Sequence, residues 1–215
     1  MRILAIETAS EACSVALFEE GVLLARDHKV LGRGHAEALI PMIGALPGKG
    51  KAGQILVSLG PGSFTGVRIG LASARALGFA WGAEVLGYPT LTLVAAMARE
   101  GRTSEELTVS MRGGHGEWFA QRFDRDGKAI GAAASLTPDA ALAINRARWI
   151  AGSSAQDFAA RAGAGIEALS LLPDAAKVAL LDQASFTAQL SPIYGRAPDA
   201  RAQPAPPTGQ QVHHV

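Results

Sequence analysis

The sequence predicts an α/β fold in two lobes, each with a mixed sheet covered by helices. The chain opens with three strand-like runs joined by hairpin turns and then alternates helical and strand-like segments. A second block of the same kind follows, which predicts the second lobe. With 215 residues, 48% of them hydrophobic, the chain is long enough to bury one or two cores.

The first lobe is predicted to begin with a meander of three strands. Residues 2–7 and 13–19 are mostly apolar, Glu20-Gly21 is a hairpin turn, and residues 22–30 form the third strand. Helices and strands then alternate. The expected elements are a helix over 35–46, a strand over 55–59, a helix over 67–81, a strand over 84–87 and a helix over 90–99.

The second lobe follows a break at residues 100–106. Its expected elements are strands over 107–111, 117–123 and 148–151, a hairpin turn at Asp126-Gly127 and a helix opened by Thr137-Pro138. We therefore predict an N-terminal lobe with partner-binding helices over residues 1–102. A C-terminal lobe over 103–196 is expected to pack its last helix back on the first lobe, and residues 197–215 are expected to form a flexible Pro-rich tail.

The composition argues against several classes of protein, among them nucleic-acid-binding proteins that act through charge alone and membrane proteins. The net charge of +1 argues against a protein that binds nucleic acid through bulk electrostatics alone. One cysteine, Cys13, excludes an internal disulfide and is expected to be a buried strand thiol. No apolar run approaches the ~20 residues that cross a bilayer, and the N-terminus has no signal-peptide pattern, so we expect a cytoplasmic protein without membrane contact.

The most informative stretch is the loop before the helix at 67–81. Pro-Gly favours a turn with a positive φ at Gly62, and Thr65 is placed to cap the helix. Such a bend can hold a phosphate, or it can fix a helix that a partner uses. The predicted helix-positioning loop consists of Gly60, Pro61, Gly62, Ser63, Phe64, Thr65 and Gly66.

These residues resemble the TsaB (YeaZ) family, which is required for threonylcarbamoyladenosine (t6A) formation in tRNA. The resemblance lies in ILAIETA at 3–9, CSVAL at 13–17, Gly34-His35 and GPGSFTGVRIG at 60–70, and it runs to about residue 100. The second lobe matches more loosely, through residues 116–118 and 192–196. Arg112-Gly113-Gly114 stands where the family usually has Asp-Ala-Arg.

The resemblance implies the two-lobed fold of actin, hexokinase and the Hsp70 ATPase domain. It implies a non-catalytic subunit that pairs through first-lobe helices with a TsaD-like catalytic subunit, joined by a TsaE-like ATPase. It also implies a homodimer when the protein is alone, with tRNA reached only through the complex.

The residues give little sign of separate chemistry, so no metal, cofactor or catalytic residue is expected. Related metal sites use two histidines four residues apart, but here His35 is followed by Leu39, so His35 is expected to be exposed or at an interface. The turn after the first strand has no glycine, and Glu7 and Glu11 would repel a triphosphate. No lysine follows Gly66, so the loop is not a P-loop.

The helix beyond the loop carries small residues every four positions: Gly70, Ala74, Gly78 and Gly82. They favour either close packing on the chain's own sheet or a helix with a second face for a partner. We predict the second arrangement, with a partner interface made of His35, Leu39, Met42, Arg68, Leu71, Ala72 and Arg75. The alternatives are a metallopeptidase-like or nucleotide-dependent enzyme of the same fold, and a direct tRNA binder.

Overall fold

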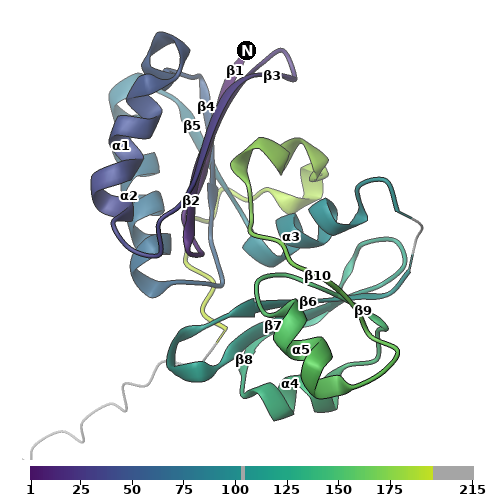
Figure 1. Cartoon of the computed structure of the whole chain (residues 1–215). Coiled ribbons are helices and arrows are strands. Elements are labelled where there is room, and N and C mark those ends of the chain that lie inside the picture. Colours follow the sequence, from purple (N-terminus) through teal and green to yellow (C-terminus); the bar gives the residue numbers. More distant parts are fainter. Residues whose placement is uncertain (103–104, 196–215) are drawn as a thin grey trace, which may run out of the picture.

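Two five-stranded sheets organise the computed structural model, which describes residues 1–102 and 105–195. Figure 1 shows the first sheet above the second, each with helices against it. This confirms the predicted α/β fold with two mixed sheets covered by helices. The tail predicted for residues 197–215 lies outside the described residues. Within the described ranges, no helix is long and apolar enough to cross a membrane.

The first sheet has the order β3-β2-β1-β4-β5. Strand β1 pairs antiparallel with β2 and parallel with β4, so it lies at the centre. Helices α1 and α2 cover one face and bury Leu39, Met42, Val67 and Leu71 against the strands. The elements are β1 (Arg2–Glu7), β2 (Ala12–Glu19), β3 (Val22–Val30), α1 (His35–Ala45), η1 (Pro47–Gly50), β4 (Gln54–Ser58), α2 (Phe64–Trp81) and β5 (Glu84–Tyr88).

The second sheet repeats this connectivity in the order β8-β7-β6-β9-β10. Central β6 pairs antiparallel with β7 and parallel with β9, as β1 does with β2 and β4. This repeat is the two-lobed actin and hexokinase type of fold that the resemblance implies. The elements are β6 (Leu107–Arg112), η2 (Gly114–Gly116), β7 (Trp118–Phe123), β8 (Ala129–Leu136), α4 (Pro138–Ile144), β9 (Trp149–Ala151), α5 (Ala155–Ala162) and β10 (Glu167–Leu169).

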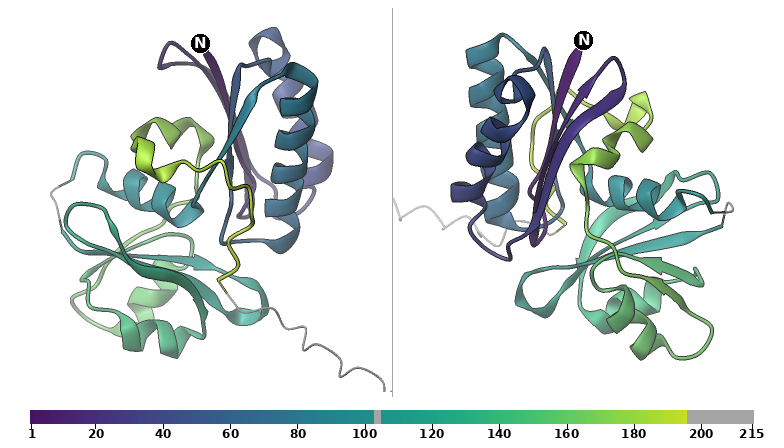
Figure 2. Two further views of the ribbon diagram at one scale, coloured as in Figure 1. Left: turned by 180° about the vertical axis from the view of Figure 1, so that it is seen from behind. Right: turned by 45° about the horizontal axis from the view of Figure 1, so that its top comes forward.

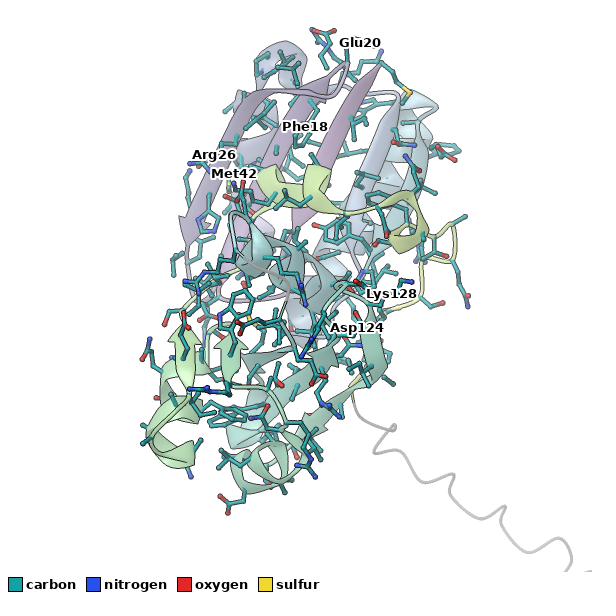
Figure 3. The ribbon with its side chains drawn as sticks, turned by 90° about the vertical axis from the view of Figure 1, so that its right-hand side faces the viewer. Phe18, Glu20, Arg26, Met42, Asp124 and Lys128 are labelled. Carbon is teal, nitrogen blue, oxygen red and sulfur yellow. The ribbon has the colours of Figure 1, made fainter. Side chains whose placement is uncertain are left out.

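Two segments lie between the sheets: α3 (Thr90–Arg99) and η3 (Ala175–Leu180), which precedes η4 (Gln183–Ser185). Both pack on the face of the first sheet that α1 and α2 leave open, and η3 buries Val178 beside Phe18. Figure 3 shows Phe18 and Arg26 on this face, where Arg26 pairs with Asp174 at 3.1 Å. The segment that returns to the first lobe therefore consists of 3-10 turns and not of an α-helix.

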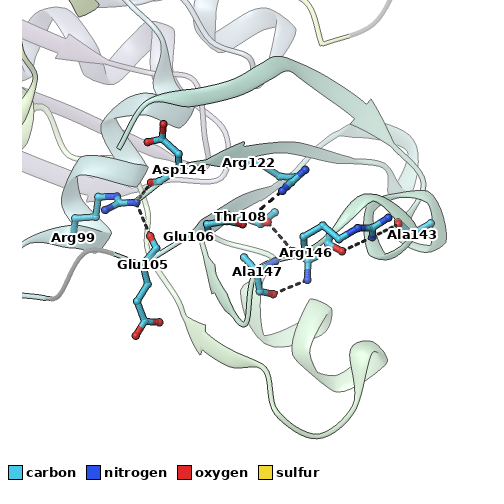
Figure 4. Close-up of polar contacts among 10 residues, drawn as sticks. Arg99, Glu105, Glu106, Thr108, Arg122, Asp124, Ala143, Arg146 and Ala147 are labelled. Carbon is cyan, nitrogen blue, oxygen red and sulfur yellow. Dashed lines mark hydrogen bonds and ion pairs between the residues drawn. The ribbon is translucent and has the colours of Figure 1, made fainter. Parts of the chain in front are cut away.

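Arg99, the last residue of α3, ties that helix to the second sheet. Its guanidinium donates hydrogen bonds to the backbone carbonyls of Glu105 at 2.6 Å and Arg125 at 2.9 Å, and to that of Asp124. Figure 4 shows Arg99 beside Asp124 and Glu105, with the Arg122–Glu106 ion pair next to them. The end of α3 is thus anchored to the β7–β8 hairpin tip.

Candidate functional site

The glycine loop is hydrogen-bonded to the turn that follows β1. The Ser63 N–H donates to the Ala9 carbonyl at 2.7 Å, and the Thr8 hydroxyl donates to the Gly66 carbonyl at 2.8 Å. A Cβ at Gly62 would lie 2.0 Å from the Ala9 carbonyl oxygen, and one at Gly66 would lie 2.1 Å from that of Thr8. These glycines are therefore required by close backbone contact.

Two local details of the loop prediction are wrong. Helix α2 begins at Phe64 and is capped by Ser63, whose hydroxyl accepts from the Gly66 N–H at 3.2 Å, so Thr65 lies in the first turn and is not the cap. The positive φ is at Gly60, at 84°, and not at Gly62. Contact with the β1 turn sets this backbone path, and the Pro-Gly pair alone does not encode it.

The small-residue stripe of α2 packs on the chain's own sheet. A Cβ at Gly70 would lie 2.4 Å from the Thr8 hydroxyl oxygen, and one at Gly78 would lie 2.4 Å from a Val85 methyl carbon. Ala74 between them is fully buried, and Gly82 caps the helix with a φ of 65°. The stripe thus brings α2 close to β1 and β5, and a partner helix is not needed to explain it.

Four of the seven predicted interface residues are buried. Leu39, Met42 and Leu71 belong to the core between the helices and the first sheet. His35, expected to be exposed or at an interface, is 6% exposed, and its Nε2 donates to the Ser10 carbonyl at 2.9 Å. These side chains pack inward because the apolar stripes of α1 and α2 face the sheet, so the prediction that they lie on the surface is wrong.

The two predicted arginines bind the chain's own C-terminal segment. The Arg68 guanidinium stacks 3.4 Å from the Phe64 ring centroid and donates to the Tyr194 hydroxyl at 3.0 Å. Arg75 donates to the Leu190 carbonyl at 2.7 Å. Of the seven, Ala72 remains as an exposed residue with a small side chain on the outer face of α2.

Sequence reasoning missed two exposed apolar side chains of this helical layer. Phe79 on α2 is 94% exposed, and Ile40 on α1 is 50% exposed. The helical spacing of Ala72, Arg75 and Phe79 was the available signal, because it places Phe79 on the same side of α2 as the other two. We call the exposed residues Ile40, Ala72, Ala76 and Phe79 the helical face.

A cleft of about 900 Å³ lies between the lobes. The β1–β2 turn and the start of α2 line one side, and the turn after β6 lines the other. Its polar lining has both signs of charge, and two of the charged groups are paired: Arg112 with Asp157 at 2.7 Å, and Glu117 with the Ser135 hydroxyl at 2.6 Å. The cleft therefore does not present the concentrated positive charge that would bind an anion, although it can hold a polar small molecule. The charged lining residues are Glu11, Arg33, Arg112, His115 and Glu117.

Glu7 does not face this cleft, contrary to the expectation that it would repel a triphosphate there. Its carboxylate is fully buried, accepts from the Ala9 N–H at 2.7 Å and lies 3.5 Å from the Thr90 hydroxyl. Burial raises the pKa of Glu7 to about 7, and the hydrogen bonds oppose that shift only in part. Glu7 is therefore a buried carboxyl group, closed off from the cleft, whose pKa is raised toward neutral pH.

The thiol of Cys13 is also closed off from solvent. Cys13 is fully buried in β2, as predicted, and burial raises the pKa of its thiol to about 11, which disfavours the nucleophilic thiolate. Among the residues that the structure describes, no three His, Cys, Asp or Glu side chains converge as metal ligands.

Comparison with known proteins places the chain in a family. A model of the family described as TsaD, tRNA N6-adenosine threonylcarbamoyltransferase, matches residues 28–197. The Escherichia coli tRNA threonylcarbamoyladenosine biosynthesis protein TsaB is 38% identical over 59% of this chain, and the match spans 58% of that relative's length. An uncharacterized Mycobacterium tuberculosis protein, Rv3421c, is 31% identical over 93% of both chains.

The solved structures agree with the sequence relatives. YeaZ from Pseudomonas aeruginosa is similar with a TM-score of 0.73 and 26% identity, over 90% of this chain and 99% of that one. The similarity therefore covers both lobes and the cleft between them. This chain belongs to the TsaB (YeaZ) family.

Proposed function

We propose that this protein acts in t6A formation on tRNA as a non-catalytic subunit that binds a TsaD-like catalytic subunit. The observation that carries the proposal is the similarity to relatives named tRNA threonylcarbamoyladenosine biosynthesis protein TsaB, from Escherichia coli, Haemophilus influenzae and Bacillus subtilis. Since the chain spans about half the length of these relatives, the activity and the partners are part of the proposal.

The environments of the reactive groups support a non-catalytic role. His35 is held by backbone carbonyls, and the Cys13 thiol is buried with a raised pKa. Neither group is placed to act as a nucleophile or a general base on a bound substrate. The mixed charges of the cleft likewise do not favour a triphosphate.

The helical face supports the partner role. Phe79 is almost fully exposed on a helix whose other side is packed into the core, and small residues beside it would let a second helix approach closely. The proposed interface therefore consists of Ile40, Ala72, Ala76 and Phe79, and it excludes the buried side chains of the predicted one. A homodimer of the isolated protein would use the same face. A TsaE-like ATPase and tRNA would join through the complex, in the cytoplasm.

Charge introduced on the helical face tests this interface. We expect Phe79→Asp and Ile40→Asp to weaken binding of the TsaD-like subunit at least tenfold, because each buries an unpaired carboxylate in an apolar contact. Isothermal titration calorimetry with the purified TsaD-like subunit measures the affinity. Since Phe79 is 94% exposed, the melting temperature of Phe79→Asp should stay near that of the parent.

Leu23→Asp is the matched control, because Leu23 is 41% exposed on the edge strand β3 and pairs with Phe18, which packs on the face of the sheet opposite to α1 and α2. Unchanged affinity in Phe79→Asp and Ile40→Asp would reject this interface. Leu71 and Arg75 are unsuitable positions for the test, since Leu71 is buried and Arg75 donates a hydrogen bond to the Leu190 carbonyl.

The competing enzyme hypothesis requires thermal stabilisation by ATP with magnesium, or a tightly bound metal in elemental analysis.

A further inference from the structure

After η4 the chain crosses from the first lobe to the second along α2. We call residues 187–195 the strap, and Figure 2 shows it running from beside β5 toward the second sheet. Its start is fixed to the first lobe: Thr187 and Gly87 exchange two backbone hydrogen bonds of 2.8 and 3.0 Å. Leu190 then accepts the Arg75 hydrogen bond and packs against the first-lobe core.

The middle of the strap is bonded to the glycine loop. The Ile193 N–H donates to the Leu59 carbonyl at 2.8 Å, and the Ile193 side chain packs on the first-lobe core. A Cβ at Gly60 would lie 3.3 Å from the Ile193 carbonyl oxygen, so the loop and the strap are in close contact. The strap therefore reaches the cleft already anchored to the first lobe.

The end of the strap is bonded to the second lobe. The Gly195 carbonyl accepts from the Ser135 N–H of β8 at 2.6 Å. A Cβ at Gly195 would lie 2.8 Å from a Phe119 ring carbon, so only glycine fits against β7 here. The strap thus spans the edge of the cleft, with Ile193, Tyr194 and Gly195 among the lining residues.

A stack of half-exposed side chains covers this crossing. Tyr194 is 49% exposed, Phe64 is 58% exposed, and their ring centroids are 6.1 Å apart with Arg68 bonded to both. Half-exposed contacts are weaker than those of a buried core. The crossing can therefore separate while the core of each lobe stays folded.

We propose that the strap is a latch that fixes the separation of the two lobes across the cleft, with the Phe64–Arg68–Tyr194 stack as its releasable contact. The chain also passes between the lobes at α3, which packs on both sheets, and between β10 and η3. A rotation of the lobes that widens the cleft must release the strap from one of them, either from the first lobe at this stack or from the second lobe at the hydrogen bond between Ser135 and Gly195. This latch is independent of the proposed role in tRNA modification, because it depends only on contacts within the chain.

The test measures the separation of the lobes in the full chain. Spin labels are placed at Ala36→Cys on α1 and Ala160→Cys on α5, two exposed positions, while native Cys13 is buried and protected from labelling. Electron–electron double resonance then compares the parent with Tyr194→Ala and Gly195→Ala. Gly114→Ala is the matched control, because a Cβ at this cleft-lining glycine would meet nothing within 4 Å.

We expect hydrogen exchange at the Ile193 amide to rise at least tenfold in both strap variants and the label distances to become broader and longer. Gly114→Ala should match the parent, and exchange in β1 and β6 should be unchanged in all variants. Faster exchange at Ile193 with unchanged label distances would show that the strap does not hold the lobes. Unchanged exchange at Ile193 in both strap variants would also overturn the latch.

Discussion

Gly66→Ala is expected to destabilise the protein by about 3 kcal/mol or more. A Cβ at Gly66 would lie 2.1 Å from the Thr8 carbonyl oxygen, and the atom it meets is backbone at the end of the central strand. Helix α2 would have to move away from β1, and the hydrogen bond from the Thr8 hydroxyl to the Gly66 carbonyl would be lost. Urea unfolding followed by circular dichroism measures the change.

Gly44→Ala in α1 is the control for this substitution. A Cβ at Gly44 meets nothing within 4 Å, so alanine should raise stability there, by up to about 1 kcal/mol, through its better helix propensity. The contrast separates close packing from the intrinsic effect of glycine in a helix. Equal effects at the two positions would mean that α2 does not need its contact with β1.

Glu7→Gln is expected to remove a pH dependence of stability worth about 3 kcal/mol. The pKa of Glu7 is raised from 4.5 to about 7 by burial, so between these pH values the folded protein binds a proton that the unfolded chain has lost. The stability of the parent should therefore fall as the pH rises from about 4.5 to 7. Glutamine is neutral throughout, and its side-chain oxygen can still accept from the Ala9 N–H.

Urea unfolding at pH 4.5, 6 and 8 measures this effect as the difference between variant and parent, which should grow in favour of Glu7→Gln as the pH rises. Glu7→Ala is the control: it also removes the ionisation, but it leaves the Ala9 N–H without its acceptor and should be less stable than Glu7→Gln at every pH. Parallel pH curves for the parent and Glu7→Gln would show that the buried carboxyl group is not the source of the dependence.

Local patterns were enough to predict most of the secondary structure. Strands β1 to β3 and the hairpin turn between β2 and β3 follow from apolar runs and turn residues, and α4 begins after Thr137 as the cap-then-proline order predicts. The start of α2 was misplaced by three residues, because Ser63 and not Thr65 caps it. Which hydroxyl caps that helix depends on how the loop is held against Ala9, and that contact is not a local property.

The candidate surface was only partly predictable. Helical spacing placed Arg68, Ala72 and Arg75 on one side of α2, and the structure shows all three exposed. It did not separate the buried Leu71 from them, and the predicted interface left out Phe79, which lies one helical turn beyond Arg75. The glycine repeat of α2 was compatible with packing on the chain's own sheet or on a partner helix. The contacts of Gly70 with Thr8 and of Gly78 with Val85 show that it packs on the sheet.

The two-lobed α/β architecture, the order of its elements and the family could be predicted from the sequence, since they depend on periodicities and motifs within short segments. The contacts of the charged and aromatic side chains could not be predicted in this way. Arg68 meets Tyr194 across 126 residues of sequence, and Arg75 meets Leu190 across 115. Such partners are set by the packing of whole elements, which brings together side chains that no local pattern relates.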